Sequence, residues 1–218
     1  MCSSDLAGTG SNKILLKSRT IITAQDFNTH AGDKIEPGEI FQGYFFRLIQ
    51  FSDVLTEDQR NLLSATGIKL LGYIPDNTYY AAIPAGYNFS LVNPFHPRSL
   101  VILTARDKMS NQLRFGNIPD QVVNKDGTIN LTVQYYSILS PDMAREQLRL
   151  QGFTVLENFD QFSQLSVAIR PEALNSLASF AWVKHVEPLF PATADDTKGR
   201  SLHRSNAINT DYGAGRHY

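Results

Sequence analysis

Residues with catalytic potential are scattered along this chain and do not form known catalytic patterns. The histidines never occur at the His-x-x-x-His or His-Glu spacing that would place two metal ligands on one helix face; they are His30, His96, His185, His203 and His217. The single cysteine, Cys2, excludes an internal disulfide and a cysteine-based metal site. No serine lies in the Gly-x-Ser-x-Gly turn of a serine hydrolase. The sequence therefore predicts no cofactor, no metal site and no catalysis by this chain.

Two polar motifs have a simpler interpretation than catalysis. Asp195-Asp196 is a pair of carboxylates, but the polar stretch 193–198 around it is typical of a solvated loop. His185 lies in an expected strand, 182–188, where it could line a binding surface. A histidine at the solvent edge of the sheet is the favoured interpretation.

Composition narrows the class of protein. With 218 residues, the chain can form one large domain or two small ones. Its 20 basic and 21 acidic residues leave a net charge of −1, without the basic excess that phosphate binding requires. Its apolar runs fall short of the roughly 20 residues that cross a bilayer. We expect a soluble globular chain that neither binds nucleic acid nor spans a membrane.

The two ends of the sequence differ from the rest. Residues 1–6 (MCSSDL) lack the basic and apolar regions of a signal peptide and look like translated adapter sequence, so we leave them out of the fold. Residues 211–218 form a glycine-containing segment that stops without a helix cap or a closing strand. We expect a chain truncated at both ends, and the missing signal peptide therefore does not indicate the cytoplasm.

A repeated pattern organises the middle of the chain. In its first copy, a strand at 44–51 precedes a helix that begins with a capping box, Thr56-Glu57-Asp58-Gln59, and ends at Gly67. Further strands are expected at 68–74, 79–83 and 99–103. Between the last two strands, residues 85–97 make a poor helix because they contain Gly86 and two prolines.

The second copy repeats this order with better helices. Ser140 and Pro141 start a helix that ends at Gly152, and Pro171 opens a second helix. Strands are expected at 130–136, 153–156, 164–169 and 182–188. Gly152 follows Gly67 by 152 − 67 = 85 residues, and Leu148 and Val155 keep the same offset from Leu63 and Leu70. Chance similarity between two α+β segments is the alternative to a true repeat.

The repeat predicts an α+β fold. We expect two tandem ferredoxin-like (βαββαβ) modules at 43–103 and 129–190, each an antiparallel sheet with helices on one face. Residues 1–42 would be an N-terminal extension, and residues 104–128 an exposed linker with one short helical turn.

The end of the second module carries a resemblance to a known family. The stretch 176–191 (SLASFAWVKHVEPLFP), with a small apolar helix before Val183, Val186 and Glu187, resembles the end of the inhibitor-type propeptide of subtilisin-like serine proteases. Segment 199–209 is similar to the lead into the catalytic domain of that family. The first module resembles the extra module that precedes the propeptide in some large secreted bacterial subtilases; the matching residues are Gln50-Phe51, Leu55-Thr56, Gln59-Arg60, Leu70 to Asn77 and Tyr79.

This resemblance implies a non-catalytic function, in which the chain assists the folding of a protease domain and blocks its active site. In the family, the propeptide sheet packs on the protease and the tail that follows it lies in the substrate cleft. The residues that would form this tail are Glu187, Pro188, Leu189, Phe190, Pro191, Ala192, Thr193 and Ala194. The implied partner is the catalytic domain of the same chain, beyond Tyr218, and the implied location is secreted or at the cell surface. Residues 191–218 would then be a processing segment, cleaved between Pro191 and Arg200, and the start of that catalytic domain.

Other functions stay open. None of the catalytic motifs of the family is present here, so no catalytic role passes to any residue. A non-proteolytic interaction module of a large secreted protein is the main alternative, because this fold serves many functions. A small-ligand regulatory domain would need glycine-rich loops, whereas Gly67 and Gly152 are better explained as helix caps.

Overall fold

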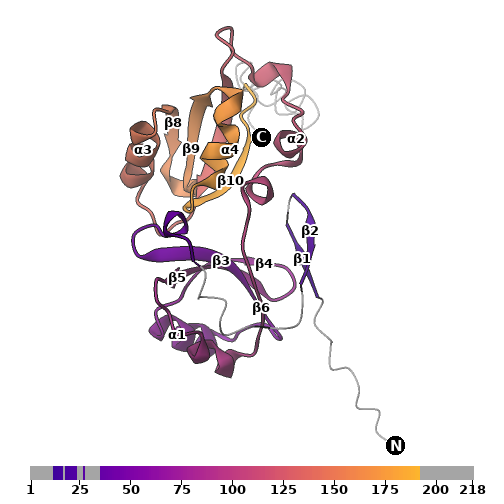
Figure 1. The fold of residues 1–218 in the computed structure, drawn as a ribbon, viewed down its shortest axis with the longest axis vertical. Helices are drawn as coiled ribbons and strands as arrows, with labels where there is room; N and C mark the ends of the chain where they lie inside the picture. The colour runs from indigo at the N-terminus through magenta and orange to yellow at the C-terminus, as the bar shows by residue number, and fades with distance from the viewer. Residues whose placement is uncertain (1–11, 17, 24–26, 28–34, 192–218) are drawn as a thin grey trace, which may run out of the picture.

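The computed structural model describes residues 12–16, 18–23, 27 and 35–191. These residues form an α+β structure with antiparallel sheets, which confirms the predicted class. Two four-stranded sheets lie one above the other along the long axis, and a two-stranded hairpin lies beside the lower one (Figure 1). No helix of the described part is long and apolar enough to cross a bilayer.

The first four-stranded sheet is built from one central strand and its partners. Its strands are β3 (Tyr44–Phe51), β4 (Lys69–Ile74), β5 (Thr78–Pro84) and β6 (Pro97–Val101), in the order β4-β5-β3-β6. Helix α1 (Glu57–Ala65) begins with the predicted capping box, in which Gln59 N donates to Thr56 Oγ1 and Thr56 N donates to Gln59 Oε1. Gly67 adopts a left-handed backbone with φ +105° directly after this helix, as a C-terminal cap requires.

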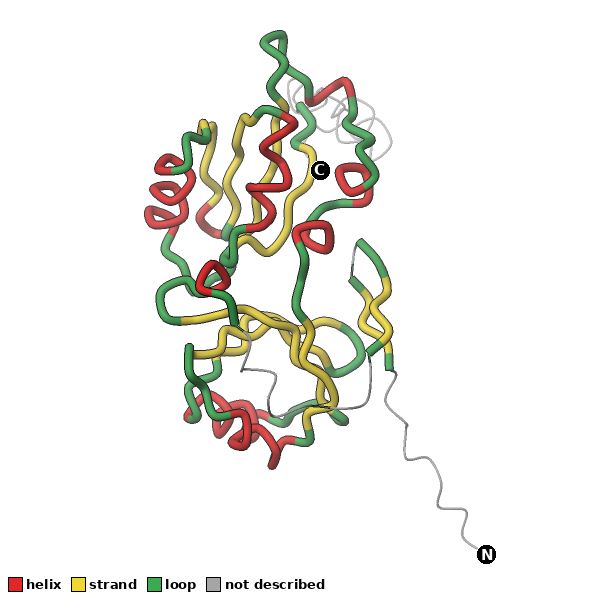
Figure 2. Tube along the Cα trace, in the orientation of Figure 1, coloured by secondary structure: helices red, strands yellow, loops and turns green. Residues whose placement is uncertain are grey.

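The predicted weak helix of the first copy is a 3-10 helix. Residues Phe89–Phe95 form η3, with Pro94 inside it, because a proline removes one backbone donor and shortens the helix. α1 and η3 cover the same face of the first sheet, and Figure 2 shows them on the side away from the second sheet. Their core includes Phe45, Ile49 and Leu63.

The opposite face of the first sheet is covered as well. A hairpin of β1 (Lys13–Leu15) and β2 (Thr20–Ile22) places Ile14 and Ile21 against Leu48 and Ile74. Residues 1–42 are predicted to be an N-terminal extension, and the structure shows that part of this extension packs on the first sheet as a hairpin. Its two strands have only one buried side chain each, a signal too short to detect in the sequence.

The second four-stranded sheet has the same pattern of strands. It consists of β7 (Ile129–Tyr135), β8 (Thr154–Phe159), β9 (Gln164–Ile169) and β10 (Val183–Pro188), in the order β10-β7-β9-β8. Helices α3 (Pro141–Leu150) and α4 (Leu174–Ser179) bury Ala144, Leu148 and Leu177 against one face. The Ser140 hydroxyl accepts a hydrogen bond from Met143 N, and Gly152 has φ +79°, so both predicted ends of α3 are confirmed.

The segment between the two sheets is ordered and packed. It contains η4 (Ala105–Lys108), α2 (Asn111–Arg114) and η5 (Asp120–Val122). Met109 forms a parallel bridge with Val186, and Ser110 N donates to Val186 O at 2.9 Å, so the segment lies along the free edge of β10. Because Met109, Leu113 and Val122 are buried, residues 104–128 are not the exposed linker that the sequence suggests.

The two sheets share one apolar interface. The ring of Phe46 stacks on that of Tyr136 with 4.6 Å between centroids and 4° between planes. Phe46 and Ala82 thereby belong to the same buried cluster as the core of the second sheet. The remaining short helices are η2 (Pro37–Glu39), η6 (Asp160–Phe162) and η7 (Pro171–Ala173).

Candidate functional site

The second sheet presents a polar face on the side away from its helices. Along β7, buried Leu131 and Val133 alternate with the partly exposed Asn130, Thr132 and Gln134. This period of two is what a strand with one buried and one accessible face requires. We call the side of the sheet that carries Asn130, Thr132 and Gln134 the polar face.

Neighbouring strands extend the polar face with further polar side chains. Thr132 lies opposite Ser166 on β9 and opposite Glu187 on β10. Gln134 lies opposite Gln164 and His185 in the same way. Because most of these side chains are polar and uncharged, the face can offer hydrogen bonds to another protein surface.

Ser166 occupies the centre of this arrangement. Its side-chain oxygen is buried and has no hydrogen-bond partner among the described residues. A buried hydroxyl without a partner costs free energy. Because Ser166 is fully buried, a partner cannot reach it, and the accessible part of the polar face includes Asn130, Thr132 and Gln134.

His185 is less accessible than the sequence suggests. Its side chain is 12 % exposed, and its Nε2 lies 3.7 Å from Oε2 of Glu187 on the same strand. The expectation of a histidine at the solvent edge is therefore wrong, because the first sheet and the hairpin border this end of the second sheet. His185 instead lines a groove of about 280 Å³ together with Gln134, Lys184 and Asp107.

The neighbour of His185 leaves the regular strand pattern. The register between β10 and β7 shifts between Val183 and His185, which leaves Lys184 as an extra residue in the strand. Its ammonium group lies 4.8 Å from the centroid of Tyr80 on the first sheet. The bulge thus directs a cation from the second sheet onto an aromatic ring of the first.

Asp107 fixes the wall of the groove. Its carboxylate accepts hydrogen bonds from Thr104 and from Arg19 Nε at 2.5 Å, which ties the hairpin to η4. Burial alone would raise the pKa of Asp107, but these hydrogen bonds outweigh burial and hold the pKa below its ordinary value. Asp107 is therefore a structural anion rather than a general base.

The predicted tail is partly incorporated into the sheet. Glu187 and Pro188 belong to β10 and face Thr132 and Leu131, and Leu189 N donates to Asn130 O at 2.9 Å. Phe190 is half exposed and Pro191 is exposed. The other three predicted tail residues, Ala192, Thr193 and Ala194, lie outside the described residues, as does the Asp195-Asp196 pair.

The site consists of hydrogen-bonding side chains and a groove. Among the residues that the structure describes, no three His, Cys, Asp or Glu side chains gather as metal ligands. The alternation along β7 could be read from the sequence, whereas the bulge at Lys184 and the groove could not, because both depend on the first sheet. What the site offers is a flat polar face, a groove beside it and a strand that leads into an exposed segment.

Comparison with known proteins adds one match. Residues 15–102 are similar to a family described as a domain of unknown function (DUF8729). This range includes most of the β1–β2 hairpin and the whole first sheet, so it covers the hairpin together with the sheet that it packs on. No curated protein and no solved structure matches the chain.

Proposed function

We propose that this chain is the non-catalytic propeptide region of a secreted bacterial subtilisin-like serine protease precursor. In this proposal, two tandem ferredoxin-like modules precede a catalytic domain in the same chain. The second module assists the folding of that domain and inhibits its active site, and the fragment itself is not an enzyme. The parent protein would be a serine endopeptidase that acts outside the cell or at its surface.

One observation carries the proposal. The second sheet keeps a polar face free of helices, and its last strand continues into the exposed residues Phe190 and Pro191. The strand order β10-β7-β9-β8, with α3 and α4 on the other face, is compatible with a βαββαβ module. A docking face next to an extended exit segment is the combination that a product-like inhibitor requires.

The proposed mechanism has two contacts. The polar face docks on the catalytic domain and lowers the ordering cost of the segment that follows. Residues 190–194 then add to the substrate cleft as a strand, where backbone hydrogen bonds bind them as they would bind a substrate. The same contacts stabilise the folded protease, because any group that binds only the native state favours it.

The first test is the identity of the downstream domain. The DNA beyond the codon for Tyr218 should encode an Asp motif, then His-Gly, then Gly-Thr-Ser, the order of catalytic motifs in subtilases. Any other downstream domain would contradict the proposal.

The second test is inhibition in trans of that catalytic domain. A chain ending at Leu189 should inhibit it at least tenfold more weakly than one ending at Ala194, with equal thermal stability. The truncation starts after Leu189 because the amide of that residue belongs to the sheet. Equal inhibition by both chains would rule out occupation of the cleft.

A substitution on the polar face tests docking separately. Thr132→Arg should weaken inhibition, because a long cation at the centre of the face prevents close approach. Asn61→Arg, on the exposed side of α1, is the matched control and should leave inhibition unchanged. Inhibition unchanged by Thr132→Arg would show that the polar face is not the docking surface.

The alternative is a non-proteolytic interaction module of a large secreted protein. The packed segment 104–128 favours it, because Met109 and Ser110 occupy the outer edge of the strand that leads into the tail. This alternative predicts that a binding partner is lost with Thr132→Arg but is retained by the chain that ends at Leu189.

A further inference from the structure

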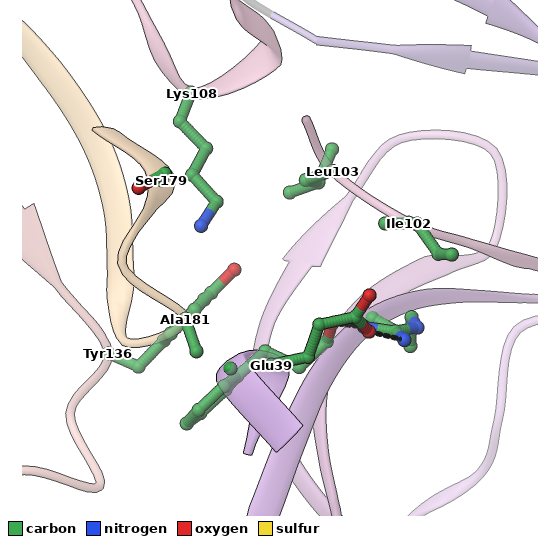
Figure 3. Close-up of a pocket in the computed structure, with 10 residues that line it drawn as sticks. Glu39, Ile102, Leu103, Lys108, Tyr136, Ser179 and Ala181 are labelled. Atoms are coloured by element: carbon green, nitrogen blue, oxygen red, sulfur yellow. Dashed lines mark hydrogen bonds and ion pairs between the residues drawn. The ribbon is translucent and has the colours of Figure 1, made fainter. Parts of the chain in front are cut away.

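A polar cavity of about 190 Å³ lies between the two sheets, apart from the polar face. Its charged groups and its one buried hydroxyl come from distant parts of the chain, namely Glu39 of η2, Arg47 of β3, Lys108 of η4 and Tyr136 after β7. Figure 3 shows the amine of Lys108 and the hydroxyl of Tyr136 pointing toward the same space. The cavity exists only because both sheets and the segment between them meet there.

Lys108 is a buried cation with unused donors. The residue is 6 % exposed, and its Nζ donates to Phe180 O at 2.7 Å. An ammonium group has three N–H donors, and no other acceptor contacts it among the described residues. Two donors therefore remain for a ligand or for water in the cavity.

The cavity carries one excess positive charge. Arg47 is paired with Glu39 and also donates to Phe46 O, so those two charges balance each other. Burial and the nearby Arg47 lower the pKa of Lys108 to about 8, against the opposing attraction of Glu39. At neutral pH, Lys108 is thus mostly charged and is not balanced by a carboxylate of its own.

Tyr136 adds a fixed neutral donor. Its ring is held by the stack on Phe46, and its hydroxyl has no hydrogen-bond partner among the described residues. Burial raises the pKa of Tyr136, so the hydroxyl stays protonated at any physiological pH. A fixed O–H beside an ammonium group suits an acceptor that carries negative charge.

The remaining wall of the cavity is mostly apolar, apart from Gly38 and from Ser179, whose hydroxyl donates to Ser176 O at 2.7 Å. Its apolar part is formed by Phe46, Ile102, Leu103 and Ala181. A ligand that matches the whole cavity has one negative charge at one end and a short apolar group at the other. A dianion such as sulfate would leave part of its charge unbalanced and would face this apolar wall.

We propose that the cavity between the sheets binds a small monocarboxylate with a short alkyl chain. One carboxylate oxygen accepts from Lys108 Nζ and the other from the Tyr136 hydroxyl, while the alkyl group contacts Phe46 and Leu103. Because the ligand contacts residues of both sheets, binding stabilises their interface. This function is independent of the protease proposal, since neither the polar face nor the tail takes part.

The experiment is a thermal denaturation series of the whole chain at pH 7 and constant ionic strength. Sodium butyrate, exchanged for sodium chloride, should raise the melting temperature by several degrees and saturate. Butyramide, which lacks the charge, should not raise it. An equal rise with sodium sulfate would show a general salt effect and overturn the proposal, as would the absence of a saturable rise with butyrate.

Variants locate the effect in the cavity. Lys108→Met should abolish the butyrate-dependent shift, and Tyr136→Phe should weaken apparent affinity at least threefold while it preserves the aromatic stack. Lys69→Met is the matched control, because Lys69 is exposed on β4 and outside the cavity, and its shift should equal that of the wild type. A shift in Lys108→Met as large as in the wild type would contradict the assignment.

A measurement on the unaltered protein does not depend on the folding of any variant. Butyrate methyl protons should show nuclear Overhauser effects to the ring protons of Phe46. Their absence at saturating butyrate would overturn the proposal. Acetyl-alanine and its amide distinguish two natural sources of the carboxylate. Binding of acetyl-alanine but not of its amide would indicate a peptide carboxyl terminus. Binding of neither compound would restrict the site to free short-chain acids.

Discussion

The two four-stranded sheets have the same strand order but differ in what covers their second face. In the first sheet, α1 and η3 cover one face, and the β1–β2 hairpin and the second sheet cover the other. In the second sheet, α3 and α4 cover one face, and the other carries Asn130, Thr132 and Gln134. The same strand order therefore occurs in one sheet with both faces covered and in the other with a partly exposed polar face.

The central strands show the cause of this difference in their residues. β3 (YFFRLIQF) is buried at every position after Tyr44, whereas β7 (INLTVQY) is buried only at alternate positions. A strand covered on both sides needs a nearly continuous apolar run, and a strand covered on one side needs alternation. The pattern of apolar residues in the central strand therefore indicates whether one or both faces of its sheet are covered.

The largest expected effect comes from breaking the helix layer of the second sheet. Leu177→Asp should unfold this sheet, because it buries an unpaired charge where the native side chain is fully buried, at a cost of about 4 kcal/mol or more. Urea denaturation followed by the fluorescence of Trp182, the single tryptophan of the chain, measures the loss. Ser176→Asp, at an exposed position of the same helix, is the control. A stable Leu177→Asp variant would mean that α4 does not hold the sheet.

The second prediction tests whether the two sheets depend on each other. Phe46→Ala removes the ring that stacks on Tyr136 and should lower the free energy of unfolding by about 3 kcal/mol. Tyr73→Ala, at a residue that is 53 % exposed on β4, should lower the free energy of unfolding much less. In differential scanning calorimetry, we expect one unfolding transition for the wild type and a broadened or split transition for Phe46→Ala. A single unshifted transition would show that the first sheet is not a platform for the second.

The features that sequence predicts correctly are local. Thr56 and Gln59 cap a helix through residues three positions apart, and Gly67 and Gly152 end helices through their own backbone freedom. The strand at 164–169 is found with its observed bounds, because its apolar alternation lies between clear breaks.

What sequence could not predict depends on distant contacts. Lys108 is a charged residue in a polar stretch, and its burial results from Phe180, 72 positions later in the chain. Arg47 is likewise a buried charge, which is paired with Glu39 and lines the cavity between the sheets. The cavity and the coverage of the first sheet are properties of the assembled sheets, for which no local pattern exists.

The third prediction concerns pH and the interface between the sheets. Lys108 has a pKa of about 8 in the folded chain against an ordinary value of 10.5, so above pH 8 the unfolded chain binds the proton that the folded chain has lost. Stability from this group therefore rises with pH, by about 2 kcal/mol between pH 7 and pH 9.5.

Comparison with Lys108→Met isolates that contribution. The groups facing Lys108 are Arg47, Glu39 and Tyr136, and they are present in both proteins. Urea denaturation at several pH values should show the stability difference between wild type and variant change in this range in favour of the wild type. A constant difference would mean that Lys108 titrates as an ordinary exposed lysine, and the interface would then be open to water.

The smallest expected effect tests the open face itself. Thr132→Val keeps the shape of the side chain and removes one hydroxyl, at a partly exposed position opposite Ser166 and Glu187. Since the side chain of Thr132 is only partly buried and the change keeps its shape, the free energy of unfolding should change by less than about 0.5 kcal/mol. Leu48 on β3 is the matched position on the covered face of the first sheet, where it packs against Ile14 and Ile21. Leu48→Ala should cost about 2 to 4 kcal/mol in the same urea denaturation assay, because it leaves a cavity in a closed core. If Thr132→Val and Leu48→Ala lower the free energy of unfolding equally, the polar face of the second sheet is as well covered as the hairpin-covered face of the first. The second sheet would then have no accessible surface for a partner.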